Sequence, residues 1–461
     1  MATTTPAPLH PPTAADGASS TVDAYLRPEM DQDQSHQRTP PAGGGGSRSR
    51  TADALQVAAE ATRGVHGGER VRGGKRQRQC PTPIITPIVQ SSTFTFQNTR
   101  ECIEYNQGIY ESFEYGRYGN PTTRAAEEKL MALEKAEDAL FSASGMNAVT
   151  TMLLALVPEG GHIVTTTDCY RRTRQFVNTV LPKMKIRTTV IDPADLDSLQ
   201  AIFESQGATV FFSESPTNPL IRVVDTPAIT KLCARYGVIS VIDTTFATPI
   251  NYRAIEHGAD LVLHSGTKYL AGHHDVLCGA IAGRADLVQE VRRLHGVLGG
   301  VIDPHAAFLV LRGMKTLALR MQAHNRNAES LAEYLTSHPK IARVHYPTLE
   351  SHIDNAVASR LFPVGFGGVL SFELAGDGNP WSRETFEATG RFVDALCIPY
   401  IGPSLGGCES LVEQVSIMGY FDQPLHERKR LGITNGLIRF AAGIECHHDL
   451  INDVEQALGH A

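Results

Sequence analysis

The amino-acid sequence predicts an α/β protein with a mostly parallel central sheet, followed by a smaller C-terminal α+β domain. From about residue 137, short apolar runs alternate with amphipathic stretches. This alternation is typical of a parallel sheet that helices cover on both faces. After about residue 323 the pattern changes to one helix followed by separate alternating segments, which predicts a second domain.

The spacing of apolar residues places the individual elements. Within residues 225–236, Ile229, Leu232 and Cys233 recur at helical spacing, so a helix is expected there. In the C-terminal part we expect a helix over residues 327–336 and strands over 369–373 and 437–441. Buried strands of the central sheet are expected over residues 139–141, 162–164, 209–212, 238–242 and 261–263.

Composition excludes several classes of protein. The chain has 461 residues, of which 42% are hydrophobic, so it can bury a large core and is long enough for two or three domains. Its formal net charge of -7 argues against a nucleic-acid partner, which requires a basic face. The longest apolar run, near residues 152–157, is too short to span a membrane, so we expect a soluble protein with no membrane partner.

The cysteines and histidines do not predict a metal site. Eight cysteines are scattered without a C-x-x-C pair, which indicates reduced thiols. The neighbouring His273 and His274 are the nearest approach to a cluster, and adjacent side chains are poorly placed to bind one ion. We therefore expect no metal.

Residues 1–75 differ in composition from the rest of the chain. They are rich in Pro, Gly, Ser and Thr and contain few large apolar residues, so a disordered tail is expected. Serine and arginine also suit an organellar targeting peptide, but acidic residues such as Asp16, Asp23 and Glu29 do not. A plain tail and a targeting peptide both remain open.

Two charged residues follow neighbouring strands of the predicted sheet. Asp243 ends the strand at 238–242, and Lys268 follows the strand at 261–263. Ligands bind at the carboxyl ends of parallel strands, and a buried carboxylate there needs a partner such as a cationic heterocycle. Burial lowers the pKa of a lysine and makes its amine a nucleophile toward carbonyls. The alternatives are an aspartate that caps the next turn and a solvated loop lysine.

Two segments near these strand ends suit an anion. Ser265 and Thr267 offer hydroxyl groups on the turn that leads to Lys268. Residues 142–146, which include Gly145 and Met146, join a strand to a helix, and small residues at a helix N-terminus leave N–H groups free for a phosphate. Alone, this second signal is weak, because many α/β turns look alike.

A turn-rich segment near residue 117 carries a phenol and a guanidinium two positions apart. Tyr115 and Arg117 lie within the run YGRYGNPTT. The planar fork of Arg117 suits a phosphate group. Taken in isolation, this motif is also compatible with a purely structural role.

Together these motifs resemble the Cys/Met-metabolism family of pyridoxal-phosphate (PLP) enzymes. The resemblance runs from about Pro81 to the C-terminus and rests on YGRYGNPTT, SASGMNAV, SESPTNP, VIDTTFATP and LHSGTKYLAGHHDV. It implies the aspartate-aminotransferase-like fold, known as fold type I. It also implies a domain plan: a tail over 1–75, an arm that contacts a neighbouring subunit over 76–135, a PLP-binding domain over 136–322 and a small domain over 323–461.

The resemblance assigns roles to individual residues. Lys268 would bind PLP as a Schiff base, Asp243 would pair with the pyridinium nitrogen and Tyr170 would stack on the ring; these three form the catalytic set. Arg439, helped by Asn218 and Ser404, would bind the substrate α-carboxylate, and Glu409 would lie near the distal part of the substrate. The phosphate would be bound by Gly145, Met146, Ser265 and Thr267 of one subunit and by Tyr115 and Arg117 of its neighbour. The active unit would then be at least a homodimer, and a homotetramer is expected.

Within the family, the runs FEYGRYGNPTT, LPKM and GGCES resemble the plant cystathionine gamma-synthases. This implies a γ-replacement in methionine biosynthesis that joins L-cysteine to an activated homoserine ester, giving L-cystathionine. It also implies a location in the plastid stroma, with the cytoplasm as the alternative. Two positions depart from the plant pattern: Thr244 stands where glycine is usual and His274 where asparagine is usual. Alternatives within the family are a cystathionine or methionine gamma-lyase and an O-acylhomoserine sulfhydrylase, and a remote alternative is a non-catalytic scaffold.

The residues after Tyr170 bear on the leaving group of the substrate. Arg171, Arg172 and Arg174 follow it directly, and methionine gamma-lyases usually place a cysteine at the position of Arg172. A cation there favours an anionic leaving group, which supports O-phosphohomoserine as the substrate. An exposed, charged helix face explains the same three arginines equally well.

Overall fold

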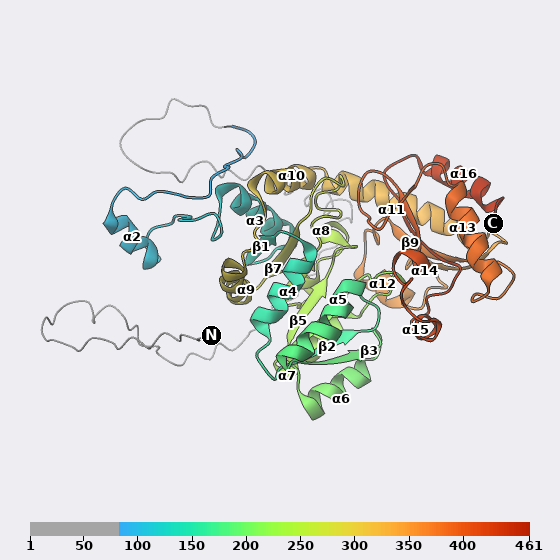
Figure 1. The fold of residues 1–461 in the computed structure, drawn as a ribbon, viewed down its shortest axis with the longest axis horizontal. Coiled ribbons are helices and arrows are strands. Elements are labelled where there is room, and N and C mark those ends of the chain that lie inside the picture. The colour runs from blue at the N-terminus through green and yellow to red at the C-terminus, as the bar shows by residue number, and fades with distance from the viewer. Residues whose placement is uncertain (1–82) are drawn as a thin grey trace, which may run out of the picture. The chain divides into compact units, whose positions relative to one another are not determined.

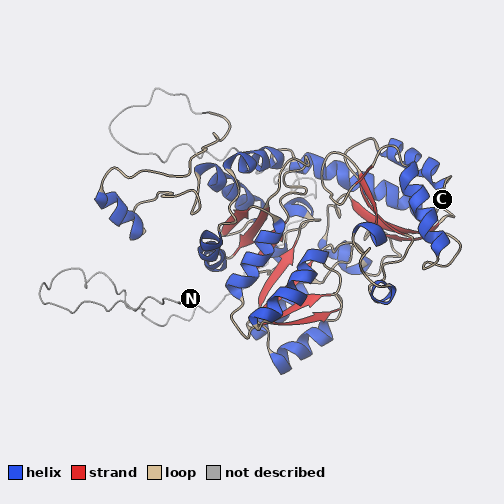
Figure 2. Cartoon of the chain, viewed as in Figure 1, coloured by secondary structure: helices blue, strands red, loops and turns tan. Residues whose placement is uncertain are grey.

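The computed structural model describes residues 83–461; the predicted tail over 1–75 and Cys80 lie outside the described residues. The described chain contains a seven-stranded sheet followed along the chain by a five-stranded sheet, with helices packed on both (Figures 1 and 2). Among residues 83–461, no helix combines the length and apolar character needed to cross a membrane.

The seven-stranded sheet has the order β1-β7-β6-β5-β4-β2-β3. Only β7 runs antiparallel to its neighbours, β1 and β6, so the predicted, mostly parallel sheet is confirmed. Two strands were not predicted, because β3 is rich in polar residues and β7 consists of glycine, alanine and one isoleucine. The strands are β1 (Asp138–Ser142), β2 (His162–Thr166), β3 (Arg187–Ile191), β4 (Val210–Glu214), β5 (Ile239–Asp243), β6 (Leu261–His264) and β7 (Gly279–Gly283).

Helices cover both faces of this sheet. On one face, Leu140 and Phe212 pack with α4 (Gly145–Leu156) and α9 (Ala285–Leu298). On the other, Phe141 and Phe211 pack with residues of α3 (Pro121–Glu134), α7 (Thr226–Tyr236) and α10 (Pro304–Met314). Successive strand residues point to opposite faces, so these nearly continuous apolar strands bury both sides. The predicted helix over 225–236 is confirmed as α7.

A long helix, α11 (Leu317–Thr336), leads from the first sheet to the second. The helix expected over 327–336 is its C-terminal half, and the boundary predicted after residue 322 falls within it. The second sheet has the order β10-β11-β12-β9-β8, with α13 (Arg383–Ala395) packed beside it and α16 (His447–Leu458) packed on α11 and α13. Its strands are β8 (Ile341–His345), β9 (Val369–Leu374), β10 (Tyr400–Ile401), β11 (Leu411–Gln414) and β12 (Leu437–Ala441), so both predicted strands of this part are confirmed.

Short helices complete the described chain. They are α2 (Thr99–Asn106), α5 (Arg171–Gln175), η2 (Phe176–Val180), η3 (Leu181–Met184), α6 (Leu196–Gln206), α8 (Thr248–Asn251), η4 (Ala254–His257), α12 (Asn355–Leu361), α14 (Val415–Met418) and α15 (Leu425–Arg430).

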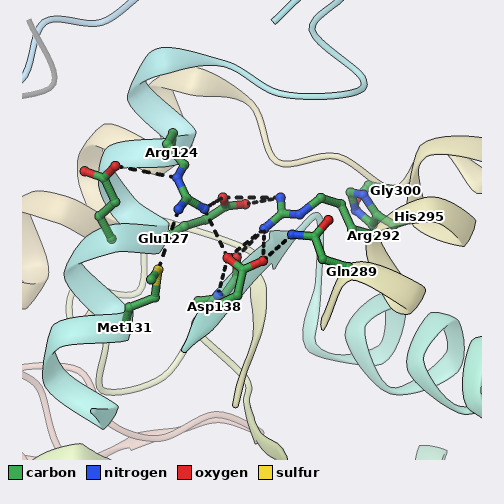
Figure 3. A network of polar contacts seen from close by, with 10 residues as sticks. Arg124, Glu127, Met131, Asp138, Gln289, Arg292, His295 and Gly300 are labelled. Atoms are coloured by element: carbon green, nitrogen blue, oxygen red, sulfur yellow. Dashed lines mark hydrogen bonds and ion pairs between the residues drawn. The ribbon is translucent and has the colours of Figure 1, made fainter. Parts of the chain in front are cut away.

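A polar network ties α3, β1 and α9 together (Figure 3). The buried carboxylates of Glu127 and Asp138 each form ion pairs with Arg124 and Arg292, at distances of 3.1–3.3 Å. Because both carboxylates are compensated by guanidinium groups, neither is left as an unpaired buried charge. The network therefore fixes α9, whose C-terminal end contacts the arm that carries Arg117.

Candidate active site

The carboxyl ends of β4, β5 and β6 lie side by side. The register pairs Glu214 with Asp243 and Asp243 with Leu263. The backbone N–H and the hydroxyl group of Thr245 both donate to Asp243 Oδ1, at 2.9 and 2.6 Å. Burial raises the pKa of Asp243, whereas the Thr245 hydrogen bonds and the charge of His264 act in the opposite direction. Asp243 is thus a half-buried carboxyl that neighbouring groups help to ionise.

Lys268 lies in the turn after β6, with its amine inside the protein. Its Nζ donates to the hydroxyl of Ser404 at 2.8 Å. Burial, and then the positive charge of Arg439, lower the pKa of Lys268 to about 8, although Glu413 opposes this shift. A larger share of the amine is therefore neutral near physiological pH than in a solvent-exposed lysine.

Arg439, on β12, joins segments that lie far apart in the sequence. It donates through Nη1 to Asn218 Oδ1 at 3.2 Å and through Nη2 to the carbonyl of Ser404 at 3.1 Å. Its Nη2 also lies 3.2 Å from Glu413 Oε2, while its buried Nε has no hydrogen-bond partner among the described residues. The structure therefore brings together Arg439, Asn218, Ser404 and, through Ser404, Lys268.

The two segments expected to bind an anion contact each other. A Cβ atom on Gly145 would lie only 3.1 Å from Ser265 Oγ, so the N-terminus of α4 faces the turn after β6. No described residue forms a hydrogen bond with Ser265 Oγ, whereas the Thr267 hydroxyl donates to the carbonyl of Cys278 at 3.1 Å. Free N–H groups of a helix N-terminus beside a hydroxyl make an anion site.

Tyr170 directly precedes α5 and exposes nearly half of its surface. Its backbone N–H donates to Glu214 Oε1 at 2.5 Å, which anchors it to the end of β4. Met146 lies close by, because its sulfur accepts a hydrogen bond from Thr173 of α5 at 3.8 Å. The backbone of Tyr170 is therefore held at the end of β4, and its side chain is partly exposed.

The three arginines after Tyr170 differ in their contacts. Arg171 donates to the carbonyl of Gly419, and Arg174 donates to the carbonyls of Thr167 and Cys169. Arg172 is exposed, and its one hydrogen bond among the described residues goes to Gln175 Oε1 at 2.8 Å. Of the three, Arg172 has the guanidinium group that is least engaged in holding the fold.

Among the described residues, no hydrogen bond or ion pair joins Tyr115 or Arg117 to Gly145 or Ser265. Instead, Arg117 donates to the carbonyl of Gly296 at 2.5 Å, and its guanidinium lies over the ring of Tyr118, 4.7 Å from the centroid. Their predicted role toward a neighbouring subunit therefore stays a prediction.

Glu409 also lies apart from the hydrogen bonds around Arg439. Its one ionisable partner among the described residues is His274, with Nε2 3.9 Å from Glu409 Oε2. About half of its side chain is exposed, so it is free to turn toward a substrate.

Three buried groups near the site escaped the sequence analysis. Glu413 pairs with Arg439, Glu214 adjoins Asp243, and His264 contacts Glu134 with Nε2 2.5 Å from Oε1. The available signals were the carboxylate inside the apolar run LVEQ and the glutamate that opens ESPTNP. Neither pattern indicates which strand or loop its side chain meets.

The residues present fit PLP. The group needs an anion site, a carboxylate facing its ring nitrogen, an amine for its aldehyde and a flat side chain against its ring. The contact between Gly145 and Ser265 offers the anion site, and Asp243 offers the carboxylate. Lys268, with its lowered pKa, offers the amine, and Tyr170 offers the flat side chain. Among residues 83–461 there is no group of three His, Cys, Asp or Glu side chains arranged to hold a metal ion.

Fold and site together define a PLP-dependent enzyme of fold type I. The chain belongs to the Cys/Met-metabolism family of PLP-dependent enzymes, whose sequence profile matches residues 67–459. It is 52% identical to cystathionine gamma-synthase 1, chloroplastic, of Nicotiana tabacum over 86% of this chain and 71% of the relative. Identity to the protein of the same name from Arabidopsis thaliana is also 52%, over 86% of this chain and 68% of the relative. A crystal structure of cystathionine gamma-synthase from Xanthomonas oryzae pv. oryzae in complex with cystathionine is 33% identical, with a TM-score of 0.78, and the match covers 88% of this chain and 98% of the other.

Proposed function

We propose that this enzyme catalyses the cystathionine gamma-synthase reaction, in which the thiol of L-cysteine replaces the group on Cγ of an activated homoserine ester to give L-cystathionine. The observation that carries the proposal is the 52% identity to two plant synthases over 86% of the chain. The cluster around Arg439 and Lys268 agrees with it, because an amino-acid substrate needs both a carboxylate site and a nearby proton carrier.

Each residue has a role that follows from its position. Arg439 binds the substrate α-carboxylate through guanidinium N–H groups that Asn218 and Ser404 orient. Lys268, with its pKa near 8, takes a proton at Cα and moves protons at Cβ. Asp243 places a negative charge at the ring nitrogen. When bound, PLP supplies an electron sink for the charge that develops at these carbons.

The leaving group is proposed to be phosphate, so that the substrate is O-phosphohomoserine. A phosphate ester carries close to two negative charges near neutral pH, and an acyl ester carries fewer. Arg172 follows Tyr170 directly and is exposed, with only Gln175 as a partner among the described residues, so it is free to bind such a group. Its planar fork matches phosphate geometry.

The deciding experiment is a panel of homoserine esters with cysteine or sulfide, with the products identified by mass. We expect cystathionine from O-phosphohomoserine and cysteine. Arg172→Ala should lower kcat/KM by about 10- to 100-fold for the phosphate ester, and much less for O-acetylhomoserine. Arg293→Ala, which removes an exposed arginine of α9, is the matched control.

Three outcomes would contradict these proposals separately. If Arg172→Ala lowered kcat/KM equally for both esters, Arg172 would have a structural role and would not bind the phosphate. A wild-type enzyme that breaks down methionine or cystathionine, and forms no cystathionine from a homoserine ester and cysteine, would be a gamma-lyase. One that uses sulfide instead of cysteine would be a sulfhydrylase.

Self-association and location complete the proposal. Within residues 83–461, Arg117 donates to the Gly296 carbonyl and forms no hydrogen bond with Gly145 or Ser265, which is compatible with a homodimer or homotetramer in which Tyr115 and Arg117 reach the neighbouring subunit. The two plant relatives are named as chloroplastic, which supports a plastid location for this enzyme.

A further inference from the structure

Glu214 is a buried carboxyl that the proposed reaction does not use. It ends β4 and exposes only 5% of its surface. Its Oε1 accepts the backbone N–H of Tyr170 at 2.5 Å, and the backbone N–H of Asn218 also acts on this carboxyl. One side chain thus contacts the segment that carries the ring-stacking tyrosine and adjoins the loop that orients Arg439.

The neighbours of Glu214 decide which carboxyl carries the charge. Asp243 lies opposite it on β5, and Asp168, in the loop after β2, also adds negative charge. Burial and then the Asp243 charge raise the pKa of Glu214 well above its ordinary value. When two carboxyls share a site, the charge on one strongly raises the pKa of the other. Each carboxyl accepts two hydrogen bonds, Asp243 from Thr245 and Glu214 from the backbone N–H groups of Tyr170 and Asn218. Only the pKa of Glu214 is raised further by the charge of its neighbour, which favours the proton on Glu214.

We propose that Glu214 is a positioning residue that acts as a neutral acid, holding Tyr170 and the Asn218 loop in place without adding a second negative charge beside Asp243. A carboxylic acid still accepts the Tyr170 N–H through its carbonyl oxygen. Only Asp243 then presents a charge to the ring nitrogen. This inference rests on the proposed residue roles within the PLP site, and not on which homoserine ester is used.

Glutamine distinguishes this role from that of a buried anion. Glu214→Gln keeps an acceptor oxygen and is neutral at every pH, so it imitates the protonated acid. Glu214→Ala removes the acceptor and leaves the Tyr170 N–H without its partner. Alanine should therefore weaken PLP binding, and glutamine should restore most of the loss.

The measurement is the dissociation constant of PLP from the reconstituted full-length enzyme, by equilibrium dialysis, together with the visible spectrum of the bound cofactor. Glu214→Ala should raise the constant by about tenfold. Glu214→Gln should return it to within about threefold of the wild-type value. A buried glutamate of β9 is the matched control: Glu373→Ala should lower the melting temperature without changing the PLP constant.

A double-mutant cycle with Tyr170→Ala tests whether Glu214 acts through Tyr170. If it does, the two alanine substitutions together should cost less than the sum of their separate effects. The proposal would be overturned if Glu214→Gln weakened PLP binding as much as Glu214→Ala does. It would also be overturned if the effects of Glu214→Ala and Tyr170→Ala on PLP binding were fully additive. The proposed reaction is tested by a different result, namely the formation of cystathionine. An enzyme that makes no cystathionine can still show this pattern of PLP binding.

Discussion

The low pKa of Lys268 predicts how fast the enzyme without cofactor captures PLP at each pH. Only the neutral amine attacks an aldehyde, and the ammonium form below the pKa does not. Burial and Arg439 lower the pKa from 10.5 to about 8. At pH 7, the neutral fraction is then about 9%, compared with about 0.03% for an ordinary lysine. The structure thus predicts covalent capture about 300-fold faster than an unperturbed lysine would allow.

This prediction is tested by measuring how the rate of PLP capture depends on pH. Cofactor-free enzyme is mixed with PLP, and the visible absorption of the bound cofactor is followed by stopped flow from pH 6 to 10. The rate should rise about tenfold per pH unit up to pH 7, bend near pH 8 and stay flat above pH 9. Arg439→Gln should move the bend to higher pH, because Arg439 lowers the pKa of Lys268. A rate that still rises about eightfold between pH 9 and 10 would refute the reasoning, since that profile belongs to a lysine with an ordinary pKa.

Three further predictions concern the same site. Lys268→Ala should purify without covalently bound PLP and lose nearly all turnover; substantial cystathionine formation by this variant would show that another lysine serves. Gly145→Ala places a Cβ 3.1 Å from Ser265 Oγ and should weaken PLP binding by about tenfold, measured by equilibrium dialysis. The control is Gly390→Ala, whose Cβ meets only one atom at 3.9 Å and which should leave PLP binding unchanged. Co-expressed Lys268→Ala and Arg117→Ala chains should recover activity that neither has alone, because a mixed dimer contains one site intact at both positions. An active monomer in sedimentation experiments would contradict a site shared between subunits.

Local sequence patterns were enough to predict the core of the central sheet. The apolar runs that became β4, β5 and β6 are too short for helices and are flanked by turn residues, and the amphipathic stretch that became α7 lies between two of them. Parallel strands end at one edge of a sheet, so the expected proximity of Asp243 to the segment leading to Lys268 followed from strand order alone. The small residues of β7 and the polar residues of β3 carry no such signal, and both strands were missed.

By itself, the sequence determined the fold class and the residues at the strand ends, because apolar periodicity and chain direction are local properties that every neighbouring residue reinforces. The family resemblance implied that Arg439 acts with Asn218 and Ser404, but only the tertiary structure showed the hydrogen bond from Arg439 to Asn218, 221 positions earlier, and the contact of Ser404 with Lys268 across 136 positions. The tertiary structure also decided that Glu413 faces Arg439 and that Glu214 lies beside Asp243, which sets the pKa of these groups. Desolvation and Coulomb interactions depend on which side chains lie within a few ångströms, and periodicity within one segment carries no information about the segment packed against it.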